Sequence, residues 1–343
     1  MKDKKLIVGA INWDCSLSED KFFGYYTSKV LSPKKYRLIT PYYADILGEN
    51  KAINHERTIE EYEREMQYAI DAGIDYFAYC WYGESPKKQD INWQCNLWEL
   101  SYARKMHLKS RLKNKLKMCA IIGVGAKEKE YTEGELKDLA IQMQEDHYQY
   151  IEGRPLVYVL NAHKNKLTEL VSKACEECGT LNPFFVNMYG GPYAECKAEL
   201  ARADALSAYG FAIYADNYDE FITGLLEDMD EKFKINSSVI PRFSLGWNPS
   251  PRIDNPVPWY GYPVGKYVEN VTPEDIRKGA QRFGDWINKN TGSIDLGHIL
   301  LFAWNEFEEG AHICPTYDKE GKGIDMERYD TVKEVIAKWK EKL

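Results

Sequence analysis

The sequence predicts a (β/α)₈ barrel, and three observations support that prediction. Eight short, nearly continuous apolar segments are spread along the 343 residues, as expected for parallel strands that are buried on both faces. A helical pattern follows each of them, and the last pattern, 326–342, supplies a helix after the eighth strand. A doubly wound sheet also alternates, but eight repeats with a closing helix favour the barrel. No linker or internal repeat divides the chain, so we expect residues 1–343 to form a single domain.

The predicted elements follow one another in regular order. The strands span 6–12, 74–82, 116–124, 155–161, 183–189, 205–211, 239–247 and 298–307. The helices span 58–73, 92–106, 133–151, 164–178, 192–203, 218–235, 272–290 and 326–342. Two helices have clear start signals, the capping box of Thr58 with Glu61 and the cap Thr272 before Pro273. The stretches 15–57 and 248–271 are too long for plain connections, so we expect functional loops there on the C-terminal face of the barrel.

Composition and charge exclude several classes of protein. A net charge of −8 and a pI near 5.5 argue against a nucleic-acid partner. No apolar run is long enough for a membrane span, and the apolar part of "MKDKKLIVGAINWD" is too short for a signal sequence. We therefore expect a cytoplasmic protein, or a periplasmic one if a leader has been removed. The eight Cys are scattered, and the close pair Cys175 and Cys178 has no second pair at ligand spacing, so we expect neither a metal nor a cofactor.

Polar and aromatic side chains follow almost every predicted strand. In a barrel these strand ends converge on one face, where amides, indoles and phenols would form a cleft that stacks on sugar rings and bonds to hydroxyl groups. A polysaccharide or oligosaccharide is the ligand that such a cleft fits. The candidate binding residues are Trp13, Trp81, Tyr82, Glu84, Asn161, His163, Asn187, Tyr189, Tyr209, Trp247, Arg252, Trp304 and Asn305.

Three glutamates follow the eighth predicted strand in the stretch "FAWNEFEEGAHICP". Glycoside cleavage typically needs two carboxyl groups, and Glu306 with Glu309, three residues further on, can supply them. Glu308 is the alternative to Glu309, because strand alternation would carry Glu306 and Glu308 to the same face. We prefer Glu309 because we expect the chain to leave strand geometry at this point. A capped, salt-bridged turn is the non-catalytic interpretation of the same residues.

The motif "WNEFEEGAHICP" resembles N-E-W-x-E-G-x-x-[IL]-E-P of the endo-α-mannosidase-like glycoside hydrolases of family 99. It is still more similar to the WbsX-like proteins of polysaccharide gene clusters. The segments "AGIDYFAYCWYGE", "YIEGRPLVYVLN" and "LGWNPSPR" resemble the second-strand, fourth-strand and G-W-D-x-S-P-R regions of these families. Together the matches span residues 65 to 315. The resemblance implies a barrel that cleaves an α-linked, manno-configured or related glycan with retention.

The resemblance also implies roles for individual residues. Glu309 matches the general acid/base, and Glu306 matches the carboxylate that deprotonates the sugar 2-hydroxyl to form an anhydro-sugar intermediate. Trp81, Tyr82, Trp247 and Arg252 would line the substrate subsites. The chain departs from the motifs at three positions: Phe307 replaces Trp, Cys314 replaces Glu and Asn248 replaces Asp. These departures bear on the substrate more than on the fold.

Two alternative functions stay open at this point. A glycosyltransferase of polysaccharide biosynthesis would need a phosphate cradle or a metal-binding acidic pair, and neither "GVGA" at 123–126 nor "DMD" at 228–230 has the required pattern. A non-catalytic carbohydrate-binding barrel would keep the aromatic cleft but leave the carboxylates salt-bridged. A glutamate with a raised pKa would distinguish the enzyme from such a binding protein. No G-x-S-x-G or H-E-x-x-H motif indicates another hydrolase.

Overall fold

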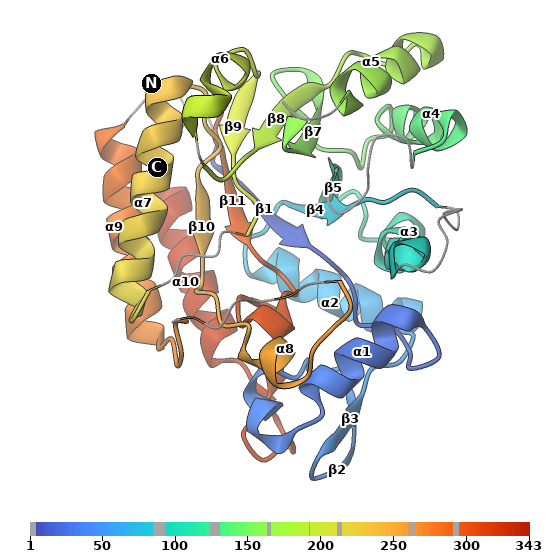
Figure 1. The fold of residues 1–343 in the computed structure, drawn as a ribbon, viewed down its shortest axis with the longest axis vertical. Helices are drawn as coiled ribbons and strands as arrows, with labels where there is room; N and C mark the ends of the chain where they lie inside the picture. The colour runs from blue at the N-terminus through green and yellow to red at the C-terminus, as the bar shows by residue number, and fades with distance from the viewer. Residues whose placement is uncertain are drawn as a thin grey trace.

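A barrel of parallel strands forms the centre of the computed structural model (Figure 1). The structure describes residues 5–84, 93–123, 131–162, 166–191, 193–210, 215–259, 261, 265, 267–290 and 295–343. The barrel strands are β1 (Ile7–Asn12), β4 (Tyr76–Cys80), β5 (Lys117–Ile122), β7 (Arg154–Leu160), β8 (Phe184–Met188), β9 (Ala205–Ser207), β10 (Arg242–Ser244) and β11 (His298–Phe302). They are neighbours in the order β10-β11-β1-β4-β5-β7-β8-β9. The parallel bridge between Leu206 and Val239 brings β9 to the chain just before β10 and closes the circle, so the predicted (β/α)₈ barrel is confirmed.

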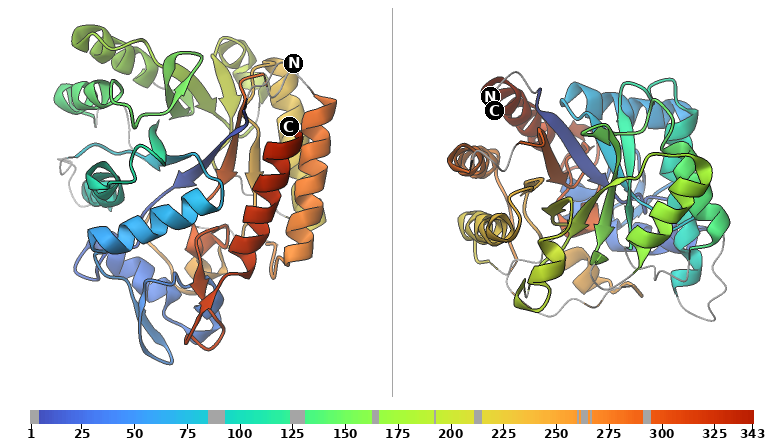
Figure 2. Two further views of the ribbon diagram at one scale, coloured as in Figure 1. Left: turned by 180° about the vertical axis from the view of Figure 1, so that it is seen from behind. Right: turned by 90° about the horizontal axis from the view of Figure 1, so that it is seen from above.

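Helices surround the barrel (Figure 2). They are α2 (Ile59–Asp71), α3 (Tyr102–Lys109), α4 (Glu133–Gln142), α5 (Leu167–Cys178), α6 (Lys197–Leu200), α7 (Tyr218–Ile235), α9 (Pro273–Lys289) and α10 (Glu327–Lys342). Both predicted start signals are present. Thr58 and Glu61 form a full capping box, and Thr272 caps α9 with Asp275 as its partner.

Three predicted helices depart clearly from the sequence pattern, and the strands expected over 205–211 and 239–247 are shorter, Ala205–Ser207 and Arg242–Ser244. The helix expected over 133–151 ends at Gln142, because Tyr150–Ile151 (β6) turns back through Glu152 and Gly153, both at positive φ, to pair with β7. The helix expected over 192–203 is a 3₁₀ turn, η5 (Tyr193–Glu195), and the one-turn α6. The helix expected over 92–106 begins with the 3₁₀ segment η2 (Trp93–Ser101), and α3 extends to Lys109.

The long connections contain short elements of their own. The region 15–57 holds α1 (Phe22–Leu31), the 3₁₀ helix η1 (Lys34–Ile39) and a hairpin of β2 (Asp45–Gly48) with β3 (Lys51–Ile53). The region 248–271 holds α8 (Ser250–Asp254), and a hairpin of β12 (Thr316–Tyr317) with β13 (Ile324–Asp325) precedes α10. Figure 1 shows α1, α8 and the β2–β3 hairpin gathered at one end of the barrel. None of the helices in the described ranges is long and apolar enough to cross a membrane.

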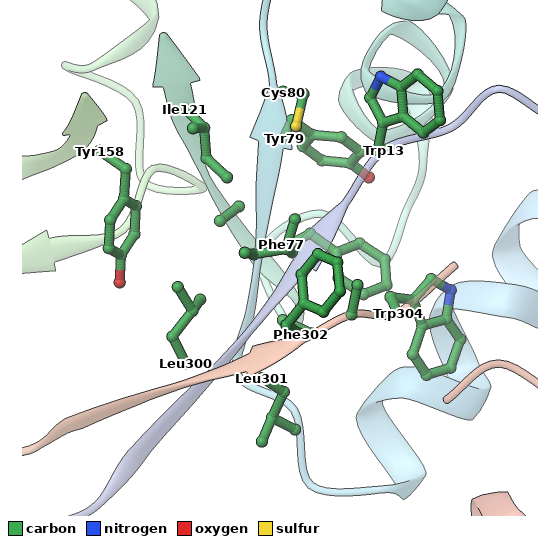
Figure 3. Close-up of a cluster of buried hydrophobic side chains, with 14 of the residues drawn as sticks. Trp13, Phe77, Tyr79, Cys80, Ile121, Tyr158, Leu300, Leu301, Phe302 and Trp304 are labelled. Atoms are coloured by element: carbon green, nitrogen blue, oxygen red, sulfur yellow. The ribbon is translucent and has the colours of Figure 1, made fainter. Parts of the chain in front are cut away.

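The barrel interior is filled with large side chains (Figure 3). On the outer side of the strands, the Phe77 and Trp304 rings pack toward α2 with their centroids 5.4 Å apart. The Tyr76 ring lies so close to Gly9 that a Cβ atom there would stand 2.1 Å from it, so only glycine fits at this position. The hydroxyl groups of Tyr76 and Tyr158 are 2.8 Å apart. The interior is therefore a packed core, and function has to be built at its C-terminal end.

Candidate active site

The segment after β11 carries the three glutamates. The strand ends at Phe302, and the chain then forms the 3₁₀ turn η7 (Phe307–Glu309), which Gly310 terminates in a left-handed conformation with φ of 65°. The eighth strand was predicted to reach 307, and the structure corrects this to 302. Because a turn replaces the strand here, side-chain alternation with a period of two no longer sets the directions of the glutamates.

Arg252 is the common partner of all three carboxylates. Its Nε donates to Glu308 Oε2 at 2.5 Å, and its Nη1 donates to Glu309 Oε1 at 2.7 Å. Its Nη2 lies 3.7 Å from Glu306 Oε2. One buried guanidinium therefore faces three carboxyl groups, and its single charge cannot balance three negative charges.

The position of Arg252 depends on how α8 begins. The Asn248 side-chain oxygen accepts hydrogen bonds from the Ser250 backbone N–H at 3.0 Å and from the Ser250 hydroxyl at 2.5 Å. This arrangement starts the short helix that carries Arg252. The Asn248 backbone N–H also donates to the Glu309 carbonyl at 2.7 Å, which ties the loop after β10 to the loop after β11. An asparagine oxygen accepts these bonds as an aspartate would, so the departure from the G-W-D motif leaves this local geometry intact.

Glu309 is held at both carboxylate oxygens. Arg252 bonds to Oε1, and the Trp247 indole N–H donates to Oε2 at 3.0 Å. Glu309 is the most exposed of the three, with 14% of its side chain accessible against 3% for Glu306. A cationic and a neutral donor on the same group suit a charged carboxylate. Glu309 is thus anchored at both oxygens and within reach of a ligand.

Glu306 lies in a different environment. The Tyr209 hydroxyl donates to Glu306 Oε1 at 2.9 Å, and Oε2 has no hydrogen-bond partner among the described residues. Burial raises the pKa of Glu306 well above its usual range, and the neighbouring Glu309 charge raises it further. The Arg252 charge acts in the opposite direction but is the smaller influence. The geometry favours a proton on Glu306 at neutral pH.

Glu308 is directed away from a position that a ligand could reach. Its Oε2 binds Arg252, and its Oε1 lies 3.8 Å from the Cys15 thiol in a fully buried setting. Burial raises the pKa of Glu308, and Arg252 acts against this effect. Glu308 and Glu309 therefore bind different nitrogens of the Arg252 guanidinium, and of these two only Glu309 is partly exposed.

Trp13 and Asn305 connect the first and eighth strands at this face. The Asn305 side-chain oxygen accepts from the Trp13 backbone N–H at 2.9 Å, and its amide nitrogen lies 3.1 Å from the Asn12 side-chain oxygen. The Arg252 guanidinium lies over the Trp13 ring, 5.1 Å from its centroid, in a cation–π contact. Asn305 thus positions the backbone that carries Trp13, and Trp13 covers one face of Arg252.

Trp81 and Tyr82 follow β4 on the same side of the barrel. Trp81 stacks on Tyr131 with the ring centroids 5.2 Å apart and the planes inclined by 23°. Burial raises the pKa of Tyr82 well above its usual range, with smaller contributions from nearby groups that include Glu306. The structure therefore brings Trp13, Tyr82, Tyr209, Trp247 and Arg252 to the glutamate cluster and places Trp81 beside it.

The side chains of Glu84 and Trp304 make their polar contacts away from the glutamate cluster. Glu84 forms ion pairs with Arg104 and, at 2.9 Å, with Lys105 on α3, which gives this carboxylate partners outside the cluster. The Trp304 indole N–H donates to Glu65 at 2.7 Å inside the protein. The contacts of these two side chains are those of packing and charge compensation.

The residues after the fourth and fifth barrel strands are also accounted for by local contacts. Asn161 ends β7 with a positive φ of 52°, and the Asn187 side-chain oxygen accepts from the backbone N–H of Ala162 at 3.2 Å. Tyr189 packs in a small apolar cluster with residues of α6 and β9. His163 lies outside the described residues.

A buried ion network beneath the site was not predicted. Arg57 binds Asp14 and Glu65 through its two terminal nitrogens, and all three side chains are almost fully buried. A signal for Glu65 exists in the sequence, because it lies within the buried face of α2 beside Tyr62 and Met66. A carboxylate on an apolar helix stripe requires a buried partner. The partners themselves come from distant segments that no local pattern connects.

In the described ranges, no three His, Cys, Asp or Glu side chains are grouped so that they could hold a metal ion. All eight Cys are free thiols, and Cys175 and Cys178 lie in the last turn of α5. Cys314, which replaces the motif glutamate, is buried, and burial raises the pKa of its thiol well above the usual range. It is therefore an uncharged packing group.

Comparisons with known proteins identify relatives by fold. No family model matches the chain, and no curated protein matches it in sequence. A family 99 endo-α-mannosidase from Bacteroides thetaiotaomicron is similar in structure, with a TM-score of 0.57 and 14% identity over 86% of this chain and 85% of that one. A glycoside hydrolase-like protein matches with a TM-score of 0.60 and 14% identity over 99% and 95% of the two chains. These similarities show the fold, a (β/α)₈ barrel shared with proteins of those descriptions.

Proposed function

We propose that the protein is a glycoside hydrolase that cleaves an α-linked, manno-configured or related glycan with retention of configuration. One observation supports this above all others. Glu306 and Glu309 share Arg252 at the C-terminal end of β11, yet one is buried beside a neutral phenol and the other is bonded by a cation. Two carboxyl groups whose surroundings favour different protonation states are the requirement for acid and base in one site.

The roles implied by the family resemblance require protons in definite places. Glu306 would take the proton of the sugar 2-hydroxyl while that oxygen bonds to the anomeric carbon. Glu309 would give its proton to the glycosidic oxygen as the bond from that oxygen to the anomeric carbon breaks. Water would then attack the anomeric carbon and give a proton to Glu309, while the sugar oxygen recovers its proton from Glu306. Both carboxyl groups return to their starting protonation states. Each of the two steps inverts the configuration of the anomeric carbon, so the overall reaction retains it.

The surroundings of the two carboxyl groups favour the proton on the other member of this pair. Burial and the Glu309 charge favour protonated Glu306, whereas Arg252 and Trp247 favour charged Glu309. The proposed reaction therefore begins with transfer of one proton from Glu306 to Glu309. Arg252 can accompany that transfer, because its Nη2 already faces Glu306 Oε2 at 3.7 Å while its Nη1 holds Glu309. A small shift of the guanidinium toward Glu306 would exchange the two environments.

Support for the substrate class comes from the site and from the fold. Trp13, Tyr82, Tyr209 and Trp247 surround the carboxylates with aromatic rings and polar tips, which suit a sugar ring. The family 99 endo-α-mannosidase has the same barrel fold and acts on an α-mannoside according to its description. The motif around Glu306 and Glu309 has the residue spacing of that family.

The test of hydrolysis is incubation with yeast α-mannan and a panel of bacterial polysaccharides in ¹⁸O-water, followed by mass spectrometry. New reducing ends that carry one ¹⁸O are expected. Unlabelled, lengthened chains would instead show a glycosyltransferase, the alternative with the same substrate class.

The acid and base roles separate when the leaving group needs no proton. On a dinitrophenyl α-glycoside of the sugar that is released, Glu309→Gln should still release a rapid burst of dinitrophenol, because the acid is dispensable in the first step. Glu306→Gln should lose activity on both substrates. The reverse result would assign the acid to Glu306 and contradict the roles that the resemblance implies.

A non-catalytic carbohydrate-binding barrel is the second candidate. The observation in its favour is that Glu308 and Glu309 are both salt-bridged to Arg252. The raised pKa of Glu306 favours the enzyme, because a binding protein has no need of a carboxyl group poised to exchange a proton. Glycan binding without any labelled product from a full panel would favour the binding protein.

A further inference from the structure

A cavity of about 590 Å³ lies on the opposite side of α8 from the carboxylates. Its walls come from η1, α8, the segment 268–273, the loop after β11 and the first turn of α10. None of the three glutamates and none of the aromatic residues around them lines it. Its size falls within the ~300–1,000 Å³ of small-molecule sites. It is a separate hollow that shares one wall with the candidate active site.

The cavity offers hydrogen-bond donors that are not fully used. Arg328 is half-buried in its wall and donates through Nη1 to the Gly310 carbonyl at 2.7 Å and the His312 carbonyl at 3.3 Å. Its other two nitrogens have no hydrogen-bond or ion-pair partner among the described residues. Burial lowers the pKa of Arg328 to about 10, so the group stays cationic at neutral pH.

The cavity also offers acceptors and an apolar surface. Glu269 and Glu327 are exposed at its rim, and their carboxylates have no hydrogen-bond or ion-pair partner in the described part of the chain. Leu38 is 48% exposed although its side chain is apolar, and Val271 and Pro273 also line the cavity. Donors, acceptors and apolar patches are therefore interspersed around one hollow.

The balance of charge narrows the class of ligand. Four carboxylates and two cations line the cavity, and one of the four, Asp254, is neutralised by Lys35. An anion would meet an excess of negative charge, and a purely apolar molecule would strip water from charged groups without replacing their bonds. A neutral ring with many hydroxyl groups avoids both problems, because it carries no negative charge and can replace the hydrogen bonds of the displaced water. Its hydroxyls can donate to carboxylates and accept from a guanidinium, while its C–H faces cover apolar side chains.

We propose that this cavity is a second carbohydrate-binding site, which takes one neutral sugar unit of the glycan while another part of the chain lies at the carboxylates. That the sugar belongs to the same glycan rests on the proposed function.

The cavity is mechanically connected to the candidate active site. Asp254 and Ser250 line the cavity, while Arg252 of the same five-residue helix faces the carboxylates. On the other wall, Arg328 holds the Gly310 carbonyl, directly after Glu309. A sugar that bonds to Arg328 and packs against α8 therefore contacts both segments that position the Arg252–Glu309 pair. Occupancy should improve binding of long chains more than turnover of short ones.

The test is methyl NMR of protein labelled at Ile, Leu and Val, titrated separately with mannose, glucose, galactose and N-acetylglucosamine. At least one sugar should shift the methyl signals of Val271 and Ile276, which line the cavity. Leu38→Trp, which fills the hollow from an exposed position, should abolish the shift. Leu181→Trp is the matched control, because Leu181 is 59% exposed and is not a cavity residue. Glu327→Gln, a rim change that leaves the volume unaltered, should weaken the shift and covers a failure of the tryptophan variant to fold.

Three outcomes decide the matter. Shifts that Leu38→Trp removes and that persist in Leu181→Trp and in Glu309→Gln support the second site, even if no substrate for turnover is found. Shifts confined to residues near Arg252, or equal in Leu38→Trp, would mean that sugar binds only at the carboxylates. Absence of any shift with all four sugars would overturn the inference while leaving the hydrolysis experiment to judge the proposed function separately.

Discussion

Two buried arginines in this protein bind carboxylates, and the number of carboxylates around each distinguishes the candidate active site from the ion network beneath it. Arg57 faces two carboxylates, Asp14 and Glu65, and the indole of Trp304 supplies Glu65 with a further donor. Arg252 faces three, of which Glu306 retains an oxygen without a hydrogen-bond partner among the described residues. The Arg57 network has one carboxylate more than its guanidinium can neutralise, and the Arg252 network has two.

The larger surplus of acid bears on the proposed chemistry of the Arg252 network. A buried carboxylate without its own cation avoids the cost of burial by keeping a proton. Burial raises the pKa of Asp14 and of Glu65 as well, but the Arg57 network is closed off from the surface, whereas Glu309 in the Arg252 network is partly exposed. The comparison teaches that the number of carboxylates for each guanidinium, more than burial alone, indicates which network is the candidate active site.

The largest expected effect is on turnover when a carboxylate of the Arg252 network is neutralised. Glu306→Gln and Glu309→Gln should each lower kcat on the natural glycan by roughly 10²–10⁴-fold, because each removes one proton-transfer group. Circular dichroism and thermal unfolding should show folded proteins in both cases. Full activity in either variant would remove that residue from the proposed pair.

The next largest effect is on stability when the Arg57 network is broken. Arg57→Met leaves Asp14 and Glu65 buried without a cation and should cost about 3–5 kcal/mol in the free energy of unfolding. Arg277→Met is the control, because its ion pair with Glu334 is exposed and should contribute less than about 1 kcal/mol. Urea denaturation measures both. Equal effects would show that the Arg57 network contributes no more than a surface pair.

Glu308→Gln tests the role of the third carboxylate that binds Arg252. Since it binds Arg252 and not an accessible position, we expect it to be a positioning residue. Glu308→Gln should lower kcat about tenfold and shift the pH profile of kcat, because Arg252 then bonds more strongly to the remaining carboxylates. A loss as complete as that of Glu309→Gln, with no residual rate on a dinitrophenyl glycoside, would show that Glu308 is itself the acid or base.

The pH dependence of stability tests the proton on Glu306. Its pKa is raised in the folded protein, so its contribution to stability is fully present below the ordinary glutamate pKa and is lost as the pH rises through the raised value. Between those two values the unfolding free energy of the unmodified protein should fall by up to about 1.4 kcal/mol per pH unit relative to Glu306→Gln. Glu176→Gln, at an exposed position, should leave the slope unchanged. Parallel curves for the unmodified protein and Glu306→Gln would show that Glu306 is ionised throughout.

The smallest expected effect concerns the loop that carries Arg252. Asn248→Asp keeps the oxygen that accepts from Ser250 and should change stability by less than about 1 kcal/mol and kcat less than threefold. Asn248→Ala removes that oxygen, and with it the start of α8, and should cost about 1 kcal/mol and a larger part of the activity. Identical behaviour of the two variants would show that the turn at Asn248 does not position Arg252.

Much of the fold could be predicted from the sequence because its signals are local. The eight strands and the starts of α2 and α9 follow from apolar runs and capping residues that act within a few positions. The helix expected over 133–151 was wrong in its second half, because pairing with β7 decides the conformation of β6. Such pairing with another strand overrides a local helical pattern.

The candidate site could be predicted only in part, for a related reason. The C-terminal ends of the strands meet at one face of the barrel, so residues that follow them could be chosen as candidates from the sequence. Those that the structure brings together are Glu306, Glu309, Tyr209, Trp247 and Arg252. The position of a residue at a strand end does not tell whether its side chain faces the barrel axis or a neighbouring helix. Glu84 and Tyr189 both contact neighbouring helices, α3 and α6. The cavity behind α8 could not be predicted, because its walls come from five segments spread over the chain.

The hydrogen bond from the Asn248 backbone to the Glu309 carbonyl has a consequence for engineering this protein. Loops on a barrel are often regarded as modules that can be exchanged one at a time. Here the loops after β10 and β11 are joined by that bond, and they also pack closely at Gly310. A Cβ atom added to Gly310 would lie only 3.3 Å from the Cβ of Asn248. A chimera that grafts either loop alone should lose the alignment of Arg252 with Glu309. Grafting both together from one donor should preserve it.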